Sequence, residues 1–188
     1  MKLKEFWNEN KKIIGKLILN QFGATFLGIM VITAASAARD QRAWLMLFAS
    51  CFASIFYLFL IYNVIWERGG QDRIKIDGGR AHRKSLTGLW IGLAANIPNF
   101  ILALLVLISD PFKGPEAPWA VTMNVTGRSL CLLWEGMYAG FVSYFSPHNP
   151  IIHLLYVFPA IFVCTFGYLL GLSNARIMSV FELKHPKK

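Results

Sequence analysis

Charge is scarce in this chain of 188 residues, and four long stretches have none at all. These stretches contain no Asp, Glu, Lys or Arg, and each runs 22 or 23 residues: Leu17–Ala38, Trp44–Trp66, Leu86–Ile108 and Pro150–Leu172. An α-helix rises about 1.5 Å per residue, so about 20 apolar residues cross the hydrocarbon core of a bilayer. The sequence therefore predicts an all-α, polytopic helical membrane protein whose solvent is the lipid bilayer.

A fifth apolar stretch, Trp119–Phe145, is as long as the others but contains Arg128 and Glu135. We expect it to be the fifth membrane-embedded segment of a single membrane domain, residues 1–188. It is either a re-entrant or interfacial segment, or a fifth full crossing whose two charges face the protein interior. The sequence Asn124–Gly127 predicts a helix break, after which both charges would share one face of the remaining helix, since they lie seven positions apart.

Acidic residues and cysteines are also few, which restricts the function. Ten Asp and Glu stand against 19 Lys and Arg, giving a net charge of +9. In a soluble protein this balance would indicate nucleic-acid binding. Here nearly all basic residues lie outside the apolar stretches, where they orient a membrane protein, so no nucleic-acid partner is expected. The three cysteines are isolated, without a Cys-x-x-Cys pair, and are interpreted as small apolar side chains.

No catalytic motif is present, so we expect neither an enzyme activity nor a cofactor. The segment Asp77–Ala81 resembles the opening of the CDP-alcohol phosphotransferase signature, but that family needs further aspartates to hold divalent metal. The aspartates of this chain are scattered over different segments, and His82 stands where the signature has arginine. Rhomboid proteases need a Gly-x-Ser motif together with a helical histidine, and CAAX proteases need paired glutamates together with intramembrane histidines. The sequence predicts neither arrangement.

The positions of the basic residues predict the topology. They concentrate before the first charge-free stretch, between the second and third, and after the last, leaving only Arg39, Arg42 and Lys113 for the opposite side. The positive-inside rule then places both termini and Glu67–Ser85 in the cytoplasm of a multi-pass plasma-membrane protein. Because five full crossings cannot place both termini on one side, the rule favours a Trp119–Phe145 segment that crosses incompletely.

The cytoplasmic loop Glu67–Ser85 is the most patterned polar segment. Paired glycines flank Arg73–Asp77, whose alternating polar and apolar residues predict a short hairpin or extended strand. The loop holds neither a Walker motif nor a dinucleotide-binding fingerprint. Its basic residues are expected to bind anionic lipid headgroups: Arg73, Lys75, Arg80, Arg83 and Lys84.

Small residues recur four positions apart in every apolar stretch. Three of these pairs are Gly-x-x-x-Gly pairs: Gly88/Gly92, Gly136/Gly140 and Gly167/Gly171. Such pairs let helix backbones approach closely inside lipid. Tight packing within the protein is the expected role, and a face reserved for a partner membrane subunit is the alternative.

Polar residues inside the third charge-free stretch mark a candidate substrate site. Pro98 predicts a helix kink, because proline lacks a backbone donor and clashes with the preceding turn. Asn96 and Asn99 flank it, either repairing the interrupted backbone or forming a midplane site of the kind that transporters use. The tentative substrate-binding residues are Asn96, Asn99, Arg128 and Glu135. Pro159 predicts a second kink in the last stretch.

Further ionisable residues are expected on the outer side, as a solvated rim that could gather with Arg128 and Glu135: Asp110, Glu116, His148 and His153. The two histidines lie five positions apart and lack the i, i+4 spacing of a zinc-binding pair. No metal site is therefore expected.

Two hypotheses on function follow. The favoured one is a small-solute transporter or a transporter membrane subunit, motivated by the polar kink and the charged fifth segment. In size and helix number the chain is similar to the substrate-binding membrane subunits of energy-coupling-factor transporters, whose first-helix small-residue motifs are matched by Ala24/Gly28 and Ala34/Ala38. An ATPase subunit would then be a partner. The alternative is a non-catalytic membrane protein that binds, assembles or regulates a partner complex.

Overall fold

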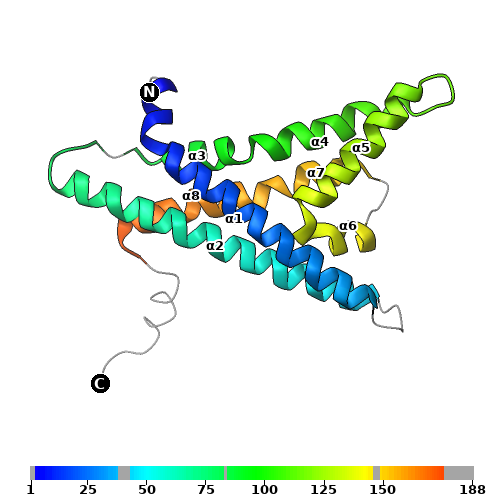
Figure 1. Ribbon diagram of the computed structural model, residues 1–188. Helices are drawn as coiled ribbons and strands as arrows, with labels where there is room; N and C mark the ends of the chain where they lie inside the picture. Colours follow the sequence, from blue (N-terminus) through cyan, green and yellow to red (C-terminus); the bar gives the residue numbers. More distant parts are fainter. Residues whose placement is uncertain (1–2, 38–42, 83, 146–148, 176–188) are drawn as a thin grey trace.

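The structure is a computed structural model that describes residues 3–37, 43–82, 84–145 and 149–175. Helices make up 88% of these residues, and none of them forms a strand, which confirms the all-α class. The order along the described chain is α1 (Leu3–Ala37), α2 (Ala43–Asp77), α3 (Thr87–Ala95), α4 (Ile97–Ser109), η1 (Asp110–Phe112), α5 (Pro118–Trp134), η2 (Gly136–Tyr138), α6 (Ala139–Phe145), α7 (Ile151–Leu155) and α8 (Val157–Ser173) (Figure 1).

Three helical segments are long and apolar enough to cross a membrane: Lys4–Ala37, Trp44–Asp77 and Ile151–Ser173. The α3 and α4 helices pass the same test only as a pair, which is bent by 53°. The described residues therefore hold three candidate spans, or four if the bent pair is one span. This is fewer than the five membrane-embedded segments predicted, because Trp119–Phe145 is divided among α5, η2 and α6.

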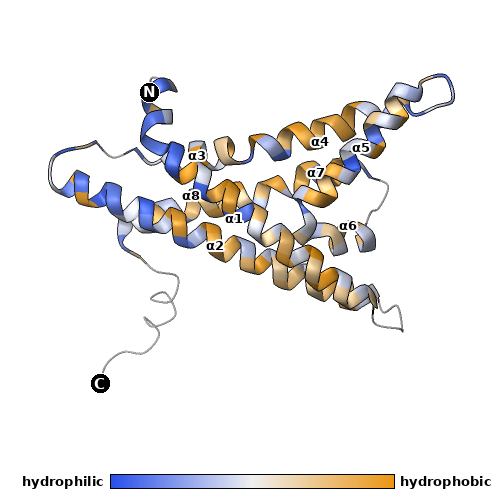
Figure 2. Ribbon diagram, viewed as in Figure 1, coloured by the Kyte–Doolittle hydropathy of each residue, from blue (hydrophilic) through white to orange (hydrophobic). Residues whose placement is uncertain are grey.

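The spans expose their apolar side chains outward. In α1 and α2, Leu19, Met30 and Phe48 are each about 70% exposed, and no more than 39% of any span's apolar window is buried. Figure 2 shows the apolar residues along the middle of the helices and the hydrophilic ones toward one end. An apolar surface of this extent is suited to lipid contact, because soluble proteins rarely expose one.

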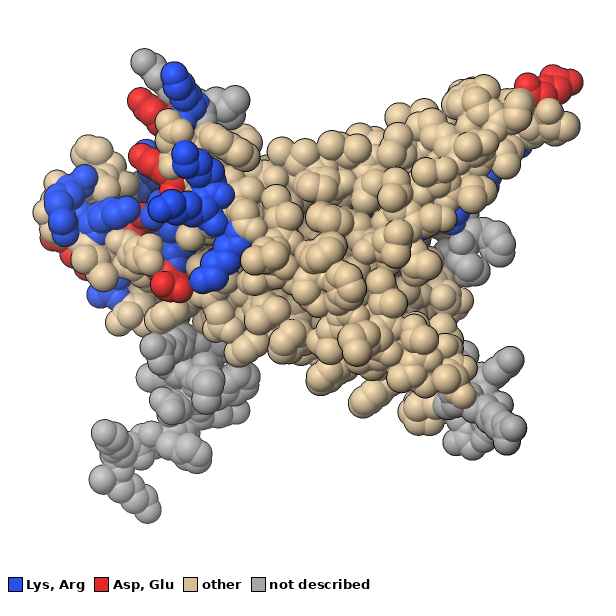
Figure 3. All heavy atoms as spheres, in the orientation of Figure 1, with Lys and Arg blue, Asp and Glu red and all other residues tan. Residues whose placement is uncertain are grey.

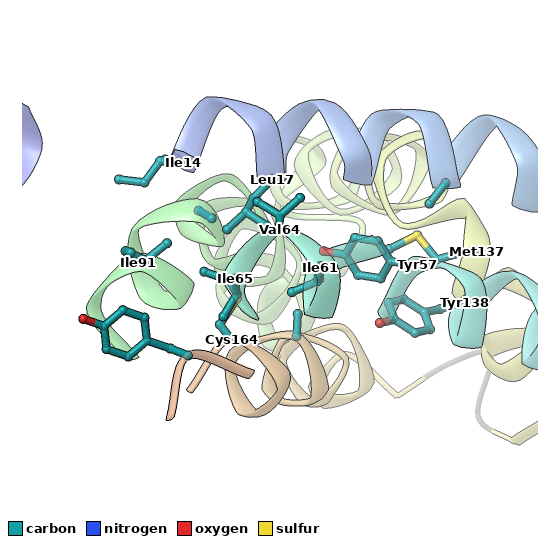
Figure 4. Close-up of a cluster of buried hydrophobic side chains, with 14 of the residues drawn as sticks. Ile14, Leu17, Tyr57, Ile61, Val64, Ile65, Ile91, Met137, Tyr138 and Cys164 are labelled. Carbon is teal, nitrogen blue, oxygen red and sulfur yellow. The ribbon is translucent and has the colours of Figure 1, made fainter. Parts of the chain in front are cut away.

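The core forms where α2 packs on α8 and on α1, and a second contact joins α4 to α5. Buried side chains of α2 meet residues of neighbouring helices in this core, among them Ile61, Ile65 and Cys164 (Figure 4). At the other end of this cluster, the ring of Tyr138 stacks on that of Tyr156, with centroids 4.7 Å apart and planes 7° from parallel.

The Gly-x-x-x-Gly pairs lie inside the protein, as their expected packing role requires. All six glycines are buried. A Cβ atom at Gly88 would stand 2.5 Å from Cβ of Tyr168, and one at Gly140 would overlap the carbonyl oxygen of Met46. These contacts leave no room for a methyl group, so the glycines permit the close approach of the helices.

The predicted hairpin or strand at Arg73–Asp77 is wrong, because α2 continues to Asp77. Pairs of opposite charge one turn apart support the helix: Arg68 lies 3.1 Å from Asp72, and Arg73 lies 3.3 Å from Asp77. The turn comes later, where Gly79 adopts a φ of +69°. The alternating polarity of this short segment therefore predicted a strand wrongly, whereas the oppositely charged pairs at i, i+4 were the signal for a helix.

The predicted break at Asn124–Gly127 is also wrong, since α5 runs without interruption through it. The side-chain amide of Asn124 donates to the carbonyl oxygen of Val106 in α4, at 3.3 Å. A Cβ at Gly127 would come within 3.0 Å of Val106 Cγ2. Both residues thus serve the contact between α5 and α4 rather than a turn, and α5 ends ten residues after Asn124 instead, at Trp134.

The break predicted by Pro98 is present. The third stretch divides at Asn96, whose backbone leaves the helical region (φ −94°, ψ 7°), with Pro98 in the first turn of α4. This break removes the helical turn with which the proline ring would clash. In the last stretch, α7 and α8 are separated only by Tyr156, whose backbone stays helical (φ −70°, ψ −13°), and Ile151–Ser173 counts as one candidate span, so the kink at Pro159 stays a prediction.

The described helix ends near the polar loop gather at one end of the bundle. Figure 1 shows the start of α1, the end of α2, the start of α3 and the end of α8 there. Figure 3 shows Lys and Arg side chains concentrated over the same region, with an uncharged surface beside it. We call this region the basic end; its lysines and arginines include Lys4, Lys11, Lys12, Arg68, Lys75, Arg80 and Lys84.

Candidate functional site

The candidate residues Asn96 and Asn99 belong to a buried polar network between α1 and α4. The Asn99 amide donates to Asn96 Oδ1 at 2.6 Å and to Gln21 Oε1 at 3.2 Å, while the Gln21 amide donates back to Asn99 Oδ1 at 2.6 Å. The side-chain amide of Asn96 donates to the carbonyl oxygen of Gly92, at 2.8 Å. All three side chains are at most 4% exposed.

Two further residues extend this network to the other helices. Tyr57 of α2 donates its hydroxyl to Gln21 Oε1, at 3.3 Å, and Thr25 donates to the carbonyl oxygen of Trp134, at 2.7 Å. That carbonyl stands at the end of α5, where no following helical turn supplies a partner. The network therefore joins the bend of the α3–α4 pair to α1, to α2 and to the end of α5.

The candidate residue Arg128 lies on α5 next to α4. Its Nε donates to Asn124 Oδ1 at 2.9 Å, and its Nη2 lies 3.2 Å from Asp110 Oδ1. Asp110 also pairs with Lys113, at 2.6 Å. Both side chains of the Arg128–Asp110 pair are less than a quarter exposed. Arg128 and Asp110, two of the residues that were expected to gather on the outer side, therefore do lie together.

The candidate residue Glu135 stands at the break after α5, where its backbone (φ −115°, ψ 25°) ends the helix. Its Oε2 lies 3.2 Å from Nδ1 of His153 in α7, and both side chains are about 5% exposed. The other carboxylate oxygen, Oε1, is buried without a hydrogen-bond partner. The expectation that His153 belongs to a solvated rim is therefore wrong, because α7 packs against α4 and the His153 side chain is buried beside Glu135.

A pocket of about 190 Å³ brings Arg128, Glu135 and His153 together. We call it the Glu135 pocket. Its wall is completed by Cys131, Leu132, Ala139, Val142 and Ser143. The sequence predicted that Arg128 and Glu135 share a helix face; the structure ends the helix at Trp134 but still places both residues on this pocket. Asn96 and Asn99 belong to the separate network described above. Glu116 does not line the pocket, and His148 lies outside the described residues.

Six of the eight residues that line the Glu135 pocket were not among the candidate substrate-binding residues, and two of these six, Cys131 and His153, can bind a metal ion. Cys131 was interpreted as an inert apolar side chain and His153 as part of the rim. Cys131 and Glu135 are four positions apart, which places them on one face of a helix and is a spacing typical of ligand pairs. This signal was available in the sequence, whereas the approach of His153, 18 positions after Glu135, depends on tertiary packing.

A second polar pocket of about 450 Å³ lies at the basic end. We call it the basic-end pocket. Its wall contains the residues Glu9, Asn10, Arg68, Asp72, Lys75, Ile76, Arg80, Ala81, His82, Lys84, Thr87 and Tyr168. Arg68 is only 7% exposed and pairs with Asp72, yet its Nε is buried without a hydrogen-bond partner. Of the expected lipid-binding residues, Lys75, Arg80 and Lys84 line this pocket, Arg73 does not, and Arg83 lies outside the described residues.

No family model matches the chain, and no curated protein and no solved structure matches it. The function is therefore inferred from the residues and their geometry alone.

Proposed function

We propose that this protein is a small-solute transporter or the solute-binding membrane subunit of one, with its solute site in the Glu135 pocket. The observation that carries the proposal is the burial of Glu135 and His153 in the wall of a pocket within an otherwise apolar, membrane-compatible bundle. Ionisable groups inside a membrane are costly, by about 2.5–3.5 kcal/mol on insertion scales, and usually mark a solute or ion pathway.

One polar group in the wall of this pocket, the Oε1 atom of Glu135, has no hydrogen-bond partner among the described residues. A buried ion pair that served stability alone would be replaced by apolar residues at little cost, often with a gain. Glu135 Oε1 has no partner among the described residues, and Arg128 supplies a positive charge to the same wall. The Oε1 atom of Glu135 is therefore suited to bind a charged or polar solute.

The size of the Glu135 pocket limits the solute. Pockets for drug-sized ligands measure about 300–1,000 Å³, so a cavity of about 190 Å³ suits an ion or a solute of few atoms. Its wall comes from the end of α5, from α6 and from α7, which are short or interrupted elements. Transporters build their sites from such discontinuous helices, because the chain breaks leave polar groups facing a cavity and can move.

In this proposal Asn96 and Asn99 act by holding the bend of α4 against α1. Gln21, which bonds to Asn99, also donates to the carbonyl oxygen of Trp134, at 3.4 Å, and so connects the asparagines to the end of α5. Glu135 follows directly on that end. The network thus positions the Glu135 pocket, although it lies apart from it.

The alternative function, assembly with a partner complex, is supported by the basic end and not by the glycine pairs, which are buried. We propose that this end faces the cytoplasm and that the basic-end pocket binds anionic lipid headgroups. The unpartnered Nε of Arg68 and the positive charges of Lys75, Arg80 and Lys84 support this assignment. The exposed basic residues around it would also suit an ATPase partner with an acidic surface.

A binding screen tests the solute site. The purified full chain in detergent is heated with members of small-solute classes: amino acids, carboxylates, vitamins, inorganic anions and metal ions. A solute that binds only the folded state at 100 times its Kd stabilises that state by about 2.7 kcal/mol. We expect at least one solute to raise the melting temperature of the wild type and of Glu116→Gln, whose side chain is exposed, but not that of Glu135→Gln. The proposal would be contradicted if no solute raised the melting temperature of the wild type, or if every solute that did so also raised that of Glu135→Gln.

A further inference from the structure

Three potential metal ligands meet in the wall of the Glu135 pocket. One atom from each of Cys131, Glu135 and His153 lies within 4.8 Å of the other two, as Sγ, a carboxylate oxygen and a ring nitrogen. Cys131 is fully buried, and the other two side chains are about 5% exposed. Cys131 lies in the last turn of α5, Glu135 directly follows the end of α5, and His153 approaches from α7.

We propose that Cys131, Glu135 and His153 bind a divalent transition-metal ion of the zinc type, with a fourth coordination position open to the pocket. This inference rests on the proposed function, since it names the solute class of the same site. It differs from the sequence-based expectation, which found no pair of histidines with zinc spacing and expected no metal.

The separations between the three ligand atoms are close to those in a tetrahedral zinc site. Zinc binds sulfur at about 2.3 Å and nitrogen or oxygen at about 2.0–2.2 Å, so ligand atoms in a tetrahedral site lie about 3.3–3.7 Å apart. Glu135 and His153 already approach to 3.2 Å. The remaining separations reach at most 4.8 Å, so ion binding would require the ligand atoms to move about 1 Å closer.

A separate observation points to a ligand at this place. Glu135 Oε1 is buried without a hydrogen-bond partner in the wall of the pocket, while Oε2 is held by His153. A buried carboxylate oxygen is normally paired, because the loss of hydration is costly. A cation is the partner that a bare carboxylate oxygen binds best, and coordination would satisfy it.

The charges in the pocket also suit a divalent ion. As ligands, a thiolate and a carboxylate contribute two negative charges and an imidazole none, so the complex with a divalent ion is neutral. Arg128 on the same wall would oppose a cation, but its charge is compensated by Asp110, 3.2 Å away. The mixture of sulfur, nitrogen and oxygen ligands favours zinc-type ions over magnesium or calcium, which prefer oxygen alone.

The test measures metal content directly. The full chain, purified without a polyhistidine tag, is loaded with Zn²⁺, desalted and analysed by elemental mass spectrometry. We expect about one zinc per chain for the wild type and for Cys164→Ala, which removes a buried cysteine outside the trio. We expect at least tenfold weaker binding for Cys131→Ala and for His153→Ala. Substitution by Co²⁺ should give a sulfur-to-cobalt charge-transfer band in the wild type, and this band should vanish in Cys131→Ala.

The outcomes separate this inference from the proposed function. Absence of zinc from the folded wild type, or equal zinc content in wild type and Cys131→Ala, overturns the metal site. If an organic solute still stabilises the wild type and not Glu135→Gln, the proposed function stands without the metal. If zinc binds as expected but cells that produce the protein show no change in any solute or metal content, the proposed function fails and the metal site stands. Cys131→Ala removes only a sulfur atom, so its folded state is checked against Cys164→Ala by melting temperature.

Discussion

Gln21 of α1 and Asn99 of α4 exchange hydrogen bonds between their side-chain amides. The Gln21 amide donates to Asn99 Oδ1 at 2.6 Å, and the Asn99 amide donates to Gln21 Oε1 at 3.2 Å. The two residues are 78 positions apart in the sequence, and both are buried. The pair is a direct polar link between the first candidate span and the bent helix pair.

A double-mutant cycle should detect this link. Gln21→Leu and Asn99→Leu each remove one partner and leave the other buried and unpaired, so the double variant should lose less stability than the sum of the two. Hydrogen bonds inside membranes couple by about 0.6 kcal/mol, up to about 1.7. We expect a coupling in this range, measured by reversible unfolding in mixed micelles.

The matched control for this cycle pairs Gln21→Leu with Asn63→Leu. Asn63 is exposed on α2 and donates only within its own helix, to the carbonyl oxygen of Phe59. Those two changes should be additive. Additive losses for Gln21→Leu and Asn99→Leu would contradict the link.

Two glycine-to-alanine changes should have opposite effects. In Gly140→Ala the new methyl group would overlap the carbonyl oxygen of Met46 and meet Ser50 Oγ, so α6 and α2 must separate. We expect a loss of about 1–3 kcal/mol, typical of overpacking. Gly23 lies within α1 with no atom near its missing Cβ, and Gly23→Ala should stabilise by up to about 1 kcal/mol. Equal melting temperatures for the two variants would contradict this account of the packing.

The sequence predicted the helical class and the break beside Pro98 because these depend on local chemistry: long apolar runs and a proline. It also predicted that the glycine pairs pack inside the protein. The errors fall where local signals compete with distant contacts. Asn124 and Gly127 are residue types that are frequent in turns, but here they lie within α5 and pack against Val106 of α4. His153 was expected at the surface because histidine is polar, but the packing of α7 against α4 buries it beside Glu135.

The topology predicted from the basic residues can be tested by labelling. The four candidate spans, if the bent pair crosses, place the basic end on one side of the membrane. In a variant without the native cysteines, a cysteine at Ser85 should react with an impermeant thiol reagent only after the cells are opened. A cysteine at Gly114, in the loop before α5, should react in intact cells. The reverse pattern would contradict the cytoplasmic placement of the basic end.

Anionic lipids should bind the basic end through the basic-end pocket. Each Lys or Arg near an anionic surface contributes about 1 kcal/mol, or about a fivefold change in affinity. We therefore expect Arg80→Gln to bind phosphatidylglycerol about fivefold more weakly, as measured by native mass spectrometry of retained lipid. Arg73→Gln is the control, since Arg73 pairs with Asp77 on the exposed side of α2 and does not line the pocket. Equal lipid retention by the two variants would show that the pocket has no special role.

The most direct test of the account compares the contents of cells that produce the wild type, Glu135→Gln, Glu116→Gln or no protein. Intracellular small solutes are measured by mass spectrometry and metals by elemental analysis, at matched amounts of protein in the membrane. We predict that at least one solute or metal changes in content with the wild type and with Glu116→Gln, and that this change disappears with Glu135→Gln. The same contents in all four cultures, or an unchanged effect in Glu135→Gln, would contradict a transport function based on the Glu135 pocket.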